Sequence, residues 1–139
     1  MPISHPESRV VLIAERDQTV RDLQRQFVEE AGYAVEFVDD GEAALLRARE
    51  IMPVAVVTEI MLPKVDGLTV CRMLAADPLT RDIPVLVFSI LSASARAHDA
   101  GAKAYLRKPI VGAIFIATLD QLVAANPNGT KEQQWASHR

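Results

Sequence analysis

The chain of 139 residues has the length and composition of one globular domain. Half of its residues are hydrophobic and 24% are charged, which excludes an intrinsically disordered protein. The net charge of −3 argues against a nucleic-acid-binding surface. The single cysteine, Cys71, excludes a disulfide within the chain, and we expect it to be a small buried hydrophobe. No apolar run is long enough for a membrane span and residues 1–8 lack the apolar core of a signal peptide, so we expect a soluble, cytoplasmic protein.

Short apolar runs alternate with helical patterns along the chain. After a leader of residues 1–8, the apolar runs predict strands at 10–14, 34–38, 54–58, 84–88 and 104–106. Apolar residues at helical spacing, Asp caps and Gly or Pro stops predict helices at 18–31, 42–51, 67–76, 93–100 and 111–125. This alternation predicts a parallel sheet with right-handed crossovers and helices on both faces, an α/β fold.

The segment after the last helix, residues 126–139, is polar and rich in turn residues. We expect a flexible tail there, which leaves residues 9–125 as the folded domain. A segment that binds a partner through Trp135 is the alternative interpretation.

Four of the predicted strands are followed by a polar side chain at the point where the apolar run ends. These residues are Glu15, Glu59, Ser89 and Lys108. The carboxyl ends of parallel strands meet at one edge of the sheet, where ligands bind in open α/β folds. The sequence therefore predicts a site formed by these four residues.

Three motifs in this order resemble the receiver domain of two-component response regulators. They are residues 59–67 (EIMLPKVDG), 82–85 (DIPV) and 100–109 (AGAKAYLRKP). The resemblance covers roughly residues 9–125. It implies a flavodoxin-like, doubly wound three-layer sandwich with a five-stranded parallel sheet in the order 2-1-3-4-5. It also implies a signalling role rather than that of an enzyme.

The chain departs from the family pattern at the acceptor and metal positions. The family has a phosphate-accepting Asp where this chain has Glu59, and two adjacent acids where it has Glu15 and Arg16. In the family these three carboxylates hold Mg²⁺. The formal charges of Glu15, Arg16, Glu59 and Lys108 cancel, so we expect Mg²⁺ binding to be weak or absent. A shift of the strand end that lets Asp17 join Glu15 and Glu59 as a metal ligand is the alternative.

Two roles are open for Glu59. Its longer side chain either imitates phospho-Asp and holds the pocket in an active-like state, or merely forms an ion pair with Arg16 or Lys108. The resemblance also implies that Ser89 is the hydroxyl that contacts the phosphoryl group, although it could instead cap the following turn. It implies that Tyr105 is the switch aromatic and that the Lys108–Pro109 peptide bond is cis.

The last predicted helix is unusually apolar. Val111 and Ile114 lie off the stripe that would face the core, close to Tyr105 in the family fold. We expect an interface for a protein partner or a homodimer on the face formed by the fourth helix, fifth strand and fifth helix. The alternative is that Ile114 fills space left by a shortened fourth helix. His98 in that helix is interpreted as a solvated residue.

The leading hypothesis is an atypical receiver domain that signals through protein contacts, including contacts with a sensor kinase, without ordinary phosphate acceptance. The alternative is a working phospho-accepting receiver that uses Glu59 or Asp66. Asp66 is also explained as a helix cap. A small-molecule-binding module is a third hypothesis, but the chain has no Gly-rich phosphate loop to support it.

Overall fold

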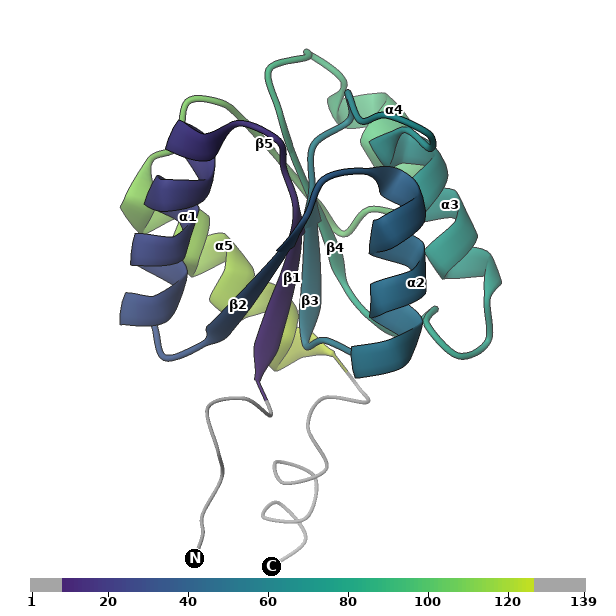
Figure 1. The fold of residues 1–139 in the computed structure, drawn as a ribbon, viewed down its shortest axis with the longest axis horizontal. Helices are drawn as coiled ribbons and strands as arrows, with labels where there is room; N and C mark the ends of the chain where they lie inside the picture. The colour runs from purple at the N-terminus through teal and green to yellow at the C-terminus, as the bar shows by residue number, and fades with distance from the viewer. Residues whose placement is uncertain (1–8, 127–139) are drawn as a thin grey trace, which may run out of the picture.

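The computed structural model describes residues 9–126, so the predicted leader and all but the first residue of the predicted tail, including Trp135, lie outside the described residues. Five strands form one parallel sheet in the order β2-β1-β3-β4-β5, which confirms the predicted fold class and strand order (Figure 1). The strands are β1 (Val10–Ala14), β2 (Ala34–Val38), β3 (Ala55–Thr58), β4 (Val85–Ser89) and β5 (Ala104–Arg107). The helices are α1 (Gln18–Glu30), α2 (Gly41–Ile51), α3 (Gly67–Ala76), α4 (Ser94–Asp99) and α5 (Gly112–Ala125).

Helices cover both faces of the sheet. Helices α1 and α5 lie on one face and α2, α3 and α4 on the other, as the left and right halves of Figure 1 show. Alternate residues of β1 point to opposite faces, so Val11 and Ile13 join the core under α1 and α5 while Leu12 packs under α2 and α3. Burial on both faces explains why the strands read as continuous apolar runs.

Local capping chemistry determines where three helices begin. The side chains of Asp17, Asp40 and Asp66 accept hydrogen bonds from backbone N–H groups in the first turns of α1, α2 and α3. Helix α4 has no side-chain cap and is only six residues long. It ends before Gly101, whose φ of +106° reverses the chain into β5.

The start of α3 packs directly on the backbone of Glu59. A Cβ atom at Gly67 would lie 2.0 Å from the carbonyl oxygen of Glu59, so only glycine allows this approach. The Gly67 N–H also donates to the carbonyl of Ile60 at 2.8 Å. The loop after β3 is therefore held against the sheet at its carboxyl edge. Within residues 9–126, every helix is too short or too polar to cross a membrane.

Candidate functional site

The four polar residues at the strand ends lie together at the carboxyl edge of the sheet. Glu15, Glu59 and Ser89 are almost fully buried. The Lys108 Nζ lies 2.9 Å from the Glu15 Oε1 and 3.0 Å from the Glu59 Oε1. One ammonium thus bridges two carboxylates that come from β1 and β3.

Both oxygens of the Glu59 carboxylate are engaged. Oε1 faces Lys108, while Oε2 accepts hydrogen bonds from the Ser89 hydroxyl, from the Ile60 N–H at 2.5 Å and from the Met61 N–H at 3.2 Å. Burial alone would raise the pKa of Glu59, but the hydrogen bonds from Ser89, Lys108 and the two amides outweigh it and lower the pKa below its ordinary value. Glu59 is therefore ionised at neutral pH.

Lys108 is the cation of the site. Burial by itself lowers its pKa, but hydrogen bonds and charge interactions with Glu15 and Glu59 raise the pKa above its ordinary value. The ammonium also lies 5.7 Å from the ring centroid of Phe88. The Lys108–Pro109 peptide bond is cis, as the resemblance implied.

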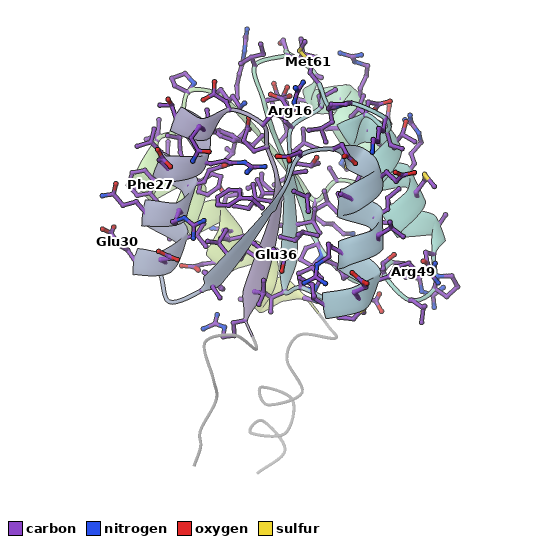
Figure 2. All side chains as sticks on the ribbon, viewed as in Figure 1. Arg16, Phe27, Glu30, Glu36, Arg49 and Met61 are labelled. Atoms are coloured by element: carbon purple, nitrogen blue, oxygen red, sulfur yellow. The ribbon has the colours of Figure 1, made fainter. Side chains whose placement is uncertain are left out.

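Arg16 does not share this buried cluster. Its side chain is exposed, and within residues 9–126 no ion pair joins it to Glu15 or Glu59. Figure 2 shows Arg16 in the upper part of the molecule. Of the two ion pairs expected for Glu59, the structure contains the one with Lys108. The expected cancellation of charge therefore does not describe the buried cluster, which has two carboxylates for one ammonium.

Arg21, which was not a predicted site residue, holds the backbone beside this cluster. Its Nε donates to the Glu15 carbonyl at 2.5 Å, and its Nη2 donates to the Val38 carbonyl at 2.9 Å and pairs with Asp39 at 2.5 Å. The ends of β1 and β2 are thereby joined. The only sequence signal was an arginine shortly after Glu15 in an amphipathic helix, and two of its partners lie far along the chain.

A chain of hydrogen bonds connects Glu59 to Tyr105. The Ser89 hydroxyl donates to Glu59 and accepts from the Leu91 N–H at 3.1 Å. The Tyr105 hydroxyl donates to the Leu91 carbonyl and accepts from the Ala93 N–H at 3.4 Å. Tyr105 is half-buried and packs against the core on the α2–α3–α4 side. The loop between β4 and α4 is thus bonded at both ends.

At the positions that the resemblance assigns to Mg²⁺, this chain has Glu15, Arg16 and Glu59. The two acids share an ammonium, and the neighbouring Arg16 is a cation. The alternative ligand Asp17 is exposed, and its carboxylate caps α1 by accepting from the Val20 N–H. Residues 9–126 contain no group of three or more His, Cys, Asp or Glu side chains placed to hold a metal ion.

The other candidate residues, Asp66, His98 and Cys71, lie outside the cluster. Asp66 is an exposed helix cap whose carboxylate accepts from the backbone N–H and the hydroxyl of Thr69, both at 2.9 Å. His98 is exposed, and Cys71 is buried, which raises the pKa of its thiol to about 12.

Val111 and Ile114 are both more than half exposed, as is Ile90 after β4. The alternative in which Ile114 fills space beside the shortened α4 is therefore wrong.

Comparison with known proteins identifies the family. Residues 11–120 match the family model described as "Response regulator receiver domain", and the chain belongs to this family. The DNA-binding dual master transcriptional regulator RpaA of Synechocystis is 39% identical over 102 residues, which cover 71% of this chain and 42% of RpaA. The response regulator MprA of Mycolicibacterium vanbaalenii is 38% identical over 102 residues, which cover 71% of this chain and 43% of MprA.

A solved structure resembles the whole fold. The signal receiver domain of a signal transduction histidine kinase from Syntrophus aciditrophicus has a TM-score of 0.79 and 27% identity, with 86% of this chain and 92% of that chain covered. The present chain spans less than half the length of RpaA and MprA. Receiver domains are signalling domains that interact with sensor histidine kinases and other proteins.

Proposed function

We propose that this chain is an atypical receiver domain of two-component or phosphorelay signalling that acts through protein contacts, without Mg²⁺-dependent phosphorylation of Glu59. The observation that carries this proposal is the engagement of both Glu59 oxygens. Oε1 is paired with Lys108, and Oε2 accepts from Ser89 and two backbone amides.

Two requirements of phosphoryl transfer to a carboxylate support this proposal. The attacking oxygen must approach phosphorus in line, and misplacement by about 1 Å costs roughly a hundredfold in rate. A divalent cation must also offset the negative oxygens brought together. At this site both carboxylates are bound to Lys108, and a cation, Arg16, occupies the position of the second family acid. Mg²⁺ would have to displace one ammonium beside a second cation.

The contacts of Ser89 and Tyr105 support an active-like role for Glu59. The resemblance assigns Ser89 to the phosphoryl group, and here its hydroxyl donates to the Glu59 carboxylate instead. The Tyr105 hydroxyl is bonded to the same loop through Leu91. Glu59 thus takes the place of phospho-Asp with a single negative charge. The switch residue Tyr105 is held in one position without phosphate.

Exposed apolar side chains after β4 and at the start of α5 support a protein-contact role. Ile90, Val111 and Ile114 are each more than half exposed and lie around the α4–β5–α5 face and its carboxyl edge. Exposed apolar groups gathered on one face favour a protein-binding surface. The partner of this surface is another signalling protein, such as a sensor kinase.

Intact-mass measurement after incubation with acetyl phosphate, with and without Mg²⁺, tests the proposal. The wild-type protein and Glu59→Asp are expected to show no phosphate adduct, because Arg16 remains in both. The double variant Arg16→Asp with Glu59→Asp is expected to gain one adduct that requires Mg²⁺. An adduct on the wild-type protein would overturn the proposal in favour of a working phospho-acceptor, and peptide mapping would assign it to Glu59 or Asp66.

A further inference from the structure

The outer side of α2 carries a stripe of three exposed residues. Glu42, Leu46 and Arg49 are spaced i, i+4 and i+7, so they lie along one face of the helix. Each side chain is more than half exposed. We call these three residues the α2 stripe. It places an acid near the start of the helix, a large apolar residue in the middle and a base near the end.

An apolar groove runs beside this stripe. It lies between α2 and α3, has a volume of about 260 Å³, and is lined mainly by Leu45, Leu46, Met73 and Leu74. Glu42 from the first turn of α2 and Arg49 from its last turn also line the groove, and Arg49 is paired there with Asp77. Met73 and Leu46 are both about half exposed or more, so two large apolar side chains border an open groove. Figure 1 shows α2 at the front of the molecule, and Figure 2 shows Arg49 on its lower outer side.

The order of charges along the stripe is self-complementary. Leu46 lies close to the midpoint between Glu42 and Arg49, which are separated by about 10 Å along the helix axis at 1.5 Å per residue. If two copies of α2 pack antiparallel about a two-fold axis at Leu46, Glu42 of each copy faces Arg49 of the other. The two Leu46 side chains then meet at the axis. Two-fold interfaces use the same patch on both subunits and need this kind of self-complementarity.

The ion pairs already present on this surface are compatible with such packing. Arg49 Nε lies 3.2 Å from Asp77, and Glu42 lies 3.6 Å from the Lys64 Nζ. Both pairs are solvent-exposed, and such pairs are worth little. A guanidinium has five N–H donors, so Arg49 can bind Asp77 and a second carboxylate together.

We infer that the α2 stripe and its groove form a surface for self-association, in which two copies of this chain pair through antiparallel α2 helices. The apolar centre is Leu46 with Met73, and the two Glu42–Arg49 pairs between copies determine the orientation. The surface is on the opposite face of the sheet from α5. The inference is independent of the chemistry proposed for Glu59.

Sedimentation equilibrium of the full chain at low salt, over a wide range of protein concentration, tests this inference. The wild-type protein is expected to form a reversible dimer that weakens as salt is added. Glu42→Arg and Arg49→Glu each place like charges opposite one another, and each is expected to raise the dissociation constant about tenfold or more. The double variant is expected to recover the wild-type constant, because both pairs are re-formed with reversed signs.

Mixing the two single variants provides a sharper measurement. Glu42→Arg has two bases on its stripe and Arg49→Glu has two acids, so an equimolar mixture is expected to form a one-to-one heterodimer that is tighter than the homodimer of either variant. This rescue requires both variants to be folded, so it separates a lost contact from a lost fold. Failure of the mixture to associate would overturn the inferred orientation.

Leu46→Glu and Leu23→Glu form the pair of apolar variants. Both residues are exposed, but Leu23 lies on α1, on the other face of the sheet. Leu46→Glu is expected to abolish the dimer and Leu23→Glu to leave it unchanged. A wild-type protein that stays monomeric at all concentrations, or a dimer that is lost only in Leu23→Glu, would overturn the inference. The groove would then bind a different molecule, or the chain would dimerise through a different face.

Discussion

Lys108 and Glu59 form an ion pair that is almost closed to solvent, with the Lys108 Nζ 3.0 Å from the Glu59 Oε1. Their side chains are only 12% and 7% exposed. The same ammonium holds Glu15 at 2.9 Å. Because the two acids have one cation between them, the stability of this edge depends on a single side chain from the end of β5.

Removal of the Lys108 charge is expected to be strongly destabilising. Lys108→Met leaves two buried carboxylates facing each other without a counterion, and we expect the free energy of unfolding to fall by about 3–5 kcal/mol. Urea denaturation measures this loss. Lys64→Met is the matched control, because the Lys64 Nζ bridges Asp40 and Glu42 at 3.7 and 3.6 Å on the exposed surface. The free energy of unfolding of Lys64→Met should fall by at most about 1 kcal/mol. Equal losses of stability in the two variants would contradict the claim that the Lys108 ammonium stabilises the buried carboxylates.

The lowered pKa of Glu59 predicts a loss of stability in acid. The ordinary value for this carboxyl is 4.5, and the folded protein has a lower one. The unfolded chain therefore takes up the proton first as pH falls, so Glu59 contributes stability above the unfolded value that is lost as pH falls through the folded value. The urea concentration at the unfolding midpoint can be measured as a function of pH. As the pH is lowered below 4.5, this midpoint should fall less steeply for Glu59→Gln than for the wild-type protein.

The control for this pH profile is Glu30→Gln. Glu30 is exposed near the end of α1, far from the buried cluster (Figure 2). That variant should follow the wild-type profile. If the pH profile of Glu59→Gln also coincides with that of the wild-type protein, Glu59 is not the group responsible for the loss of stability in acid.

Loss of the Ser89 hydroxyl is expected to affect both Glu59 and Tyr105. Ser89→Ala removes a hydrogen bond to a carboxylate, so stability should fall by about 1.5–3 kcal/mol and the pKa of Glu59 should rise. The Leu91 N–H also loses its acceptor, and the Tyr105 hydroxyl is bonded to the Leu91 carbonyl. NMR of the Glu59 carboxyl and the Tyr105 ring measures both effects. Ser94→Ala, at an exposed serine at the start of α4, should change neither signal.

Gln24 offers a stabilising substitution. It is 1% exposed on the inner side of α1, and neither of its amide atoms has a hydrogen-bond partner among residues 9–126. Burying an unpaired amide is costly, so Gln24→Leu should raise the free energy of unfolding by about 1–2 kcal/mol. Gln26→Leu, at an exposed position two residues along α1, is expected to change it by less than about 0.5 kcal/mol. A destabilised Gln24→Leu variant would contradict this expectation and indicate that the Gln24 side chain makes a stabilising interaction.

Most of the fold was predictable because its signals are local. The apolar runs of β1 and β2 and the caps Asp17 and Asp66 depend on neighbours within a few residues, and the observed boundaries lie within one residue of most predicted ones. The meeting of Glu15, Glu59, Ser89 and Lys108 was also predictable, because parallel strands bring their carboxyl ends to one edge.

The assignment of a cation to Glu59 was not predictable in the same way. The sequence left both Arg16 and Lys108 open as partners, and the structure pairs Glu59 with Lys108. Side chains alternate in direction at the end of β1, so Glu15 points inward while Arg16, the next residue, is exposed. Lys108 comes from a strand two places away from β3 in the sheet.

Local pattern was thus sufficient for the strands, the helices and the gathering of polar groups, since each depends on short-range propensity or on parallel topology. Tertiary packing determined the partners of Glu59, the backbone contacts of Arg21 and the unpaired amide of Gln24. They depend on which way a side chain leaves the backbone and on what lies there from distant parts of the chain, and no short-range pattern contains that information.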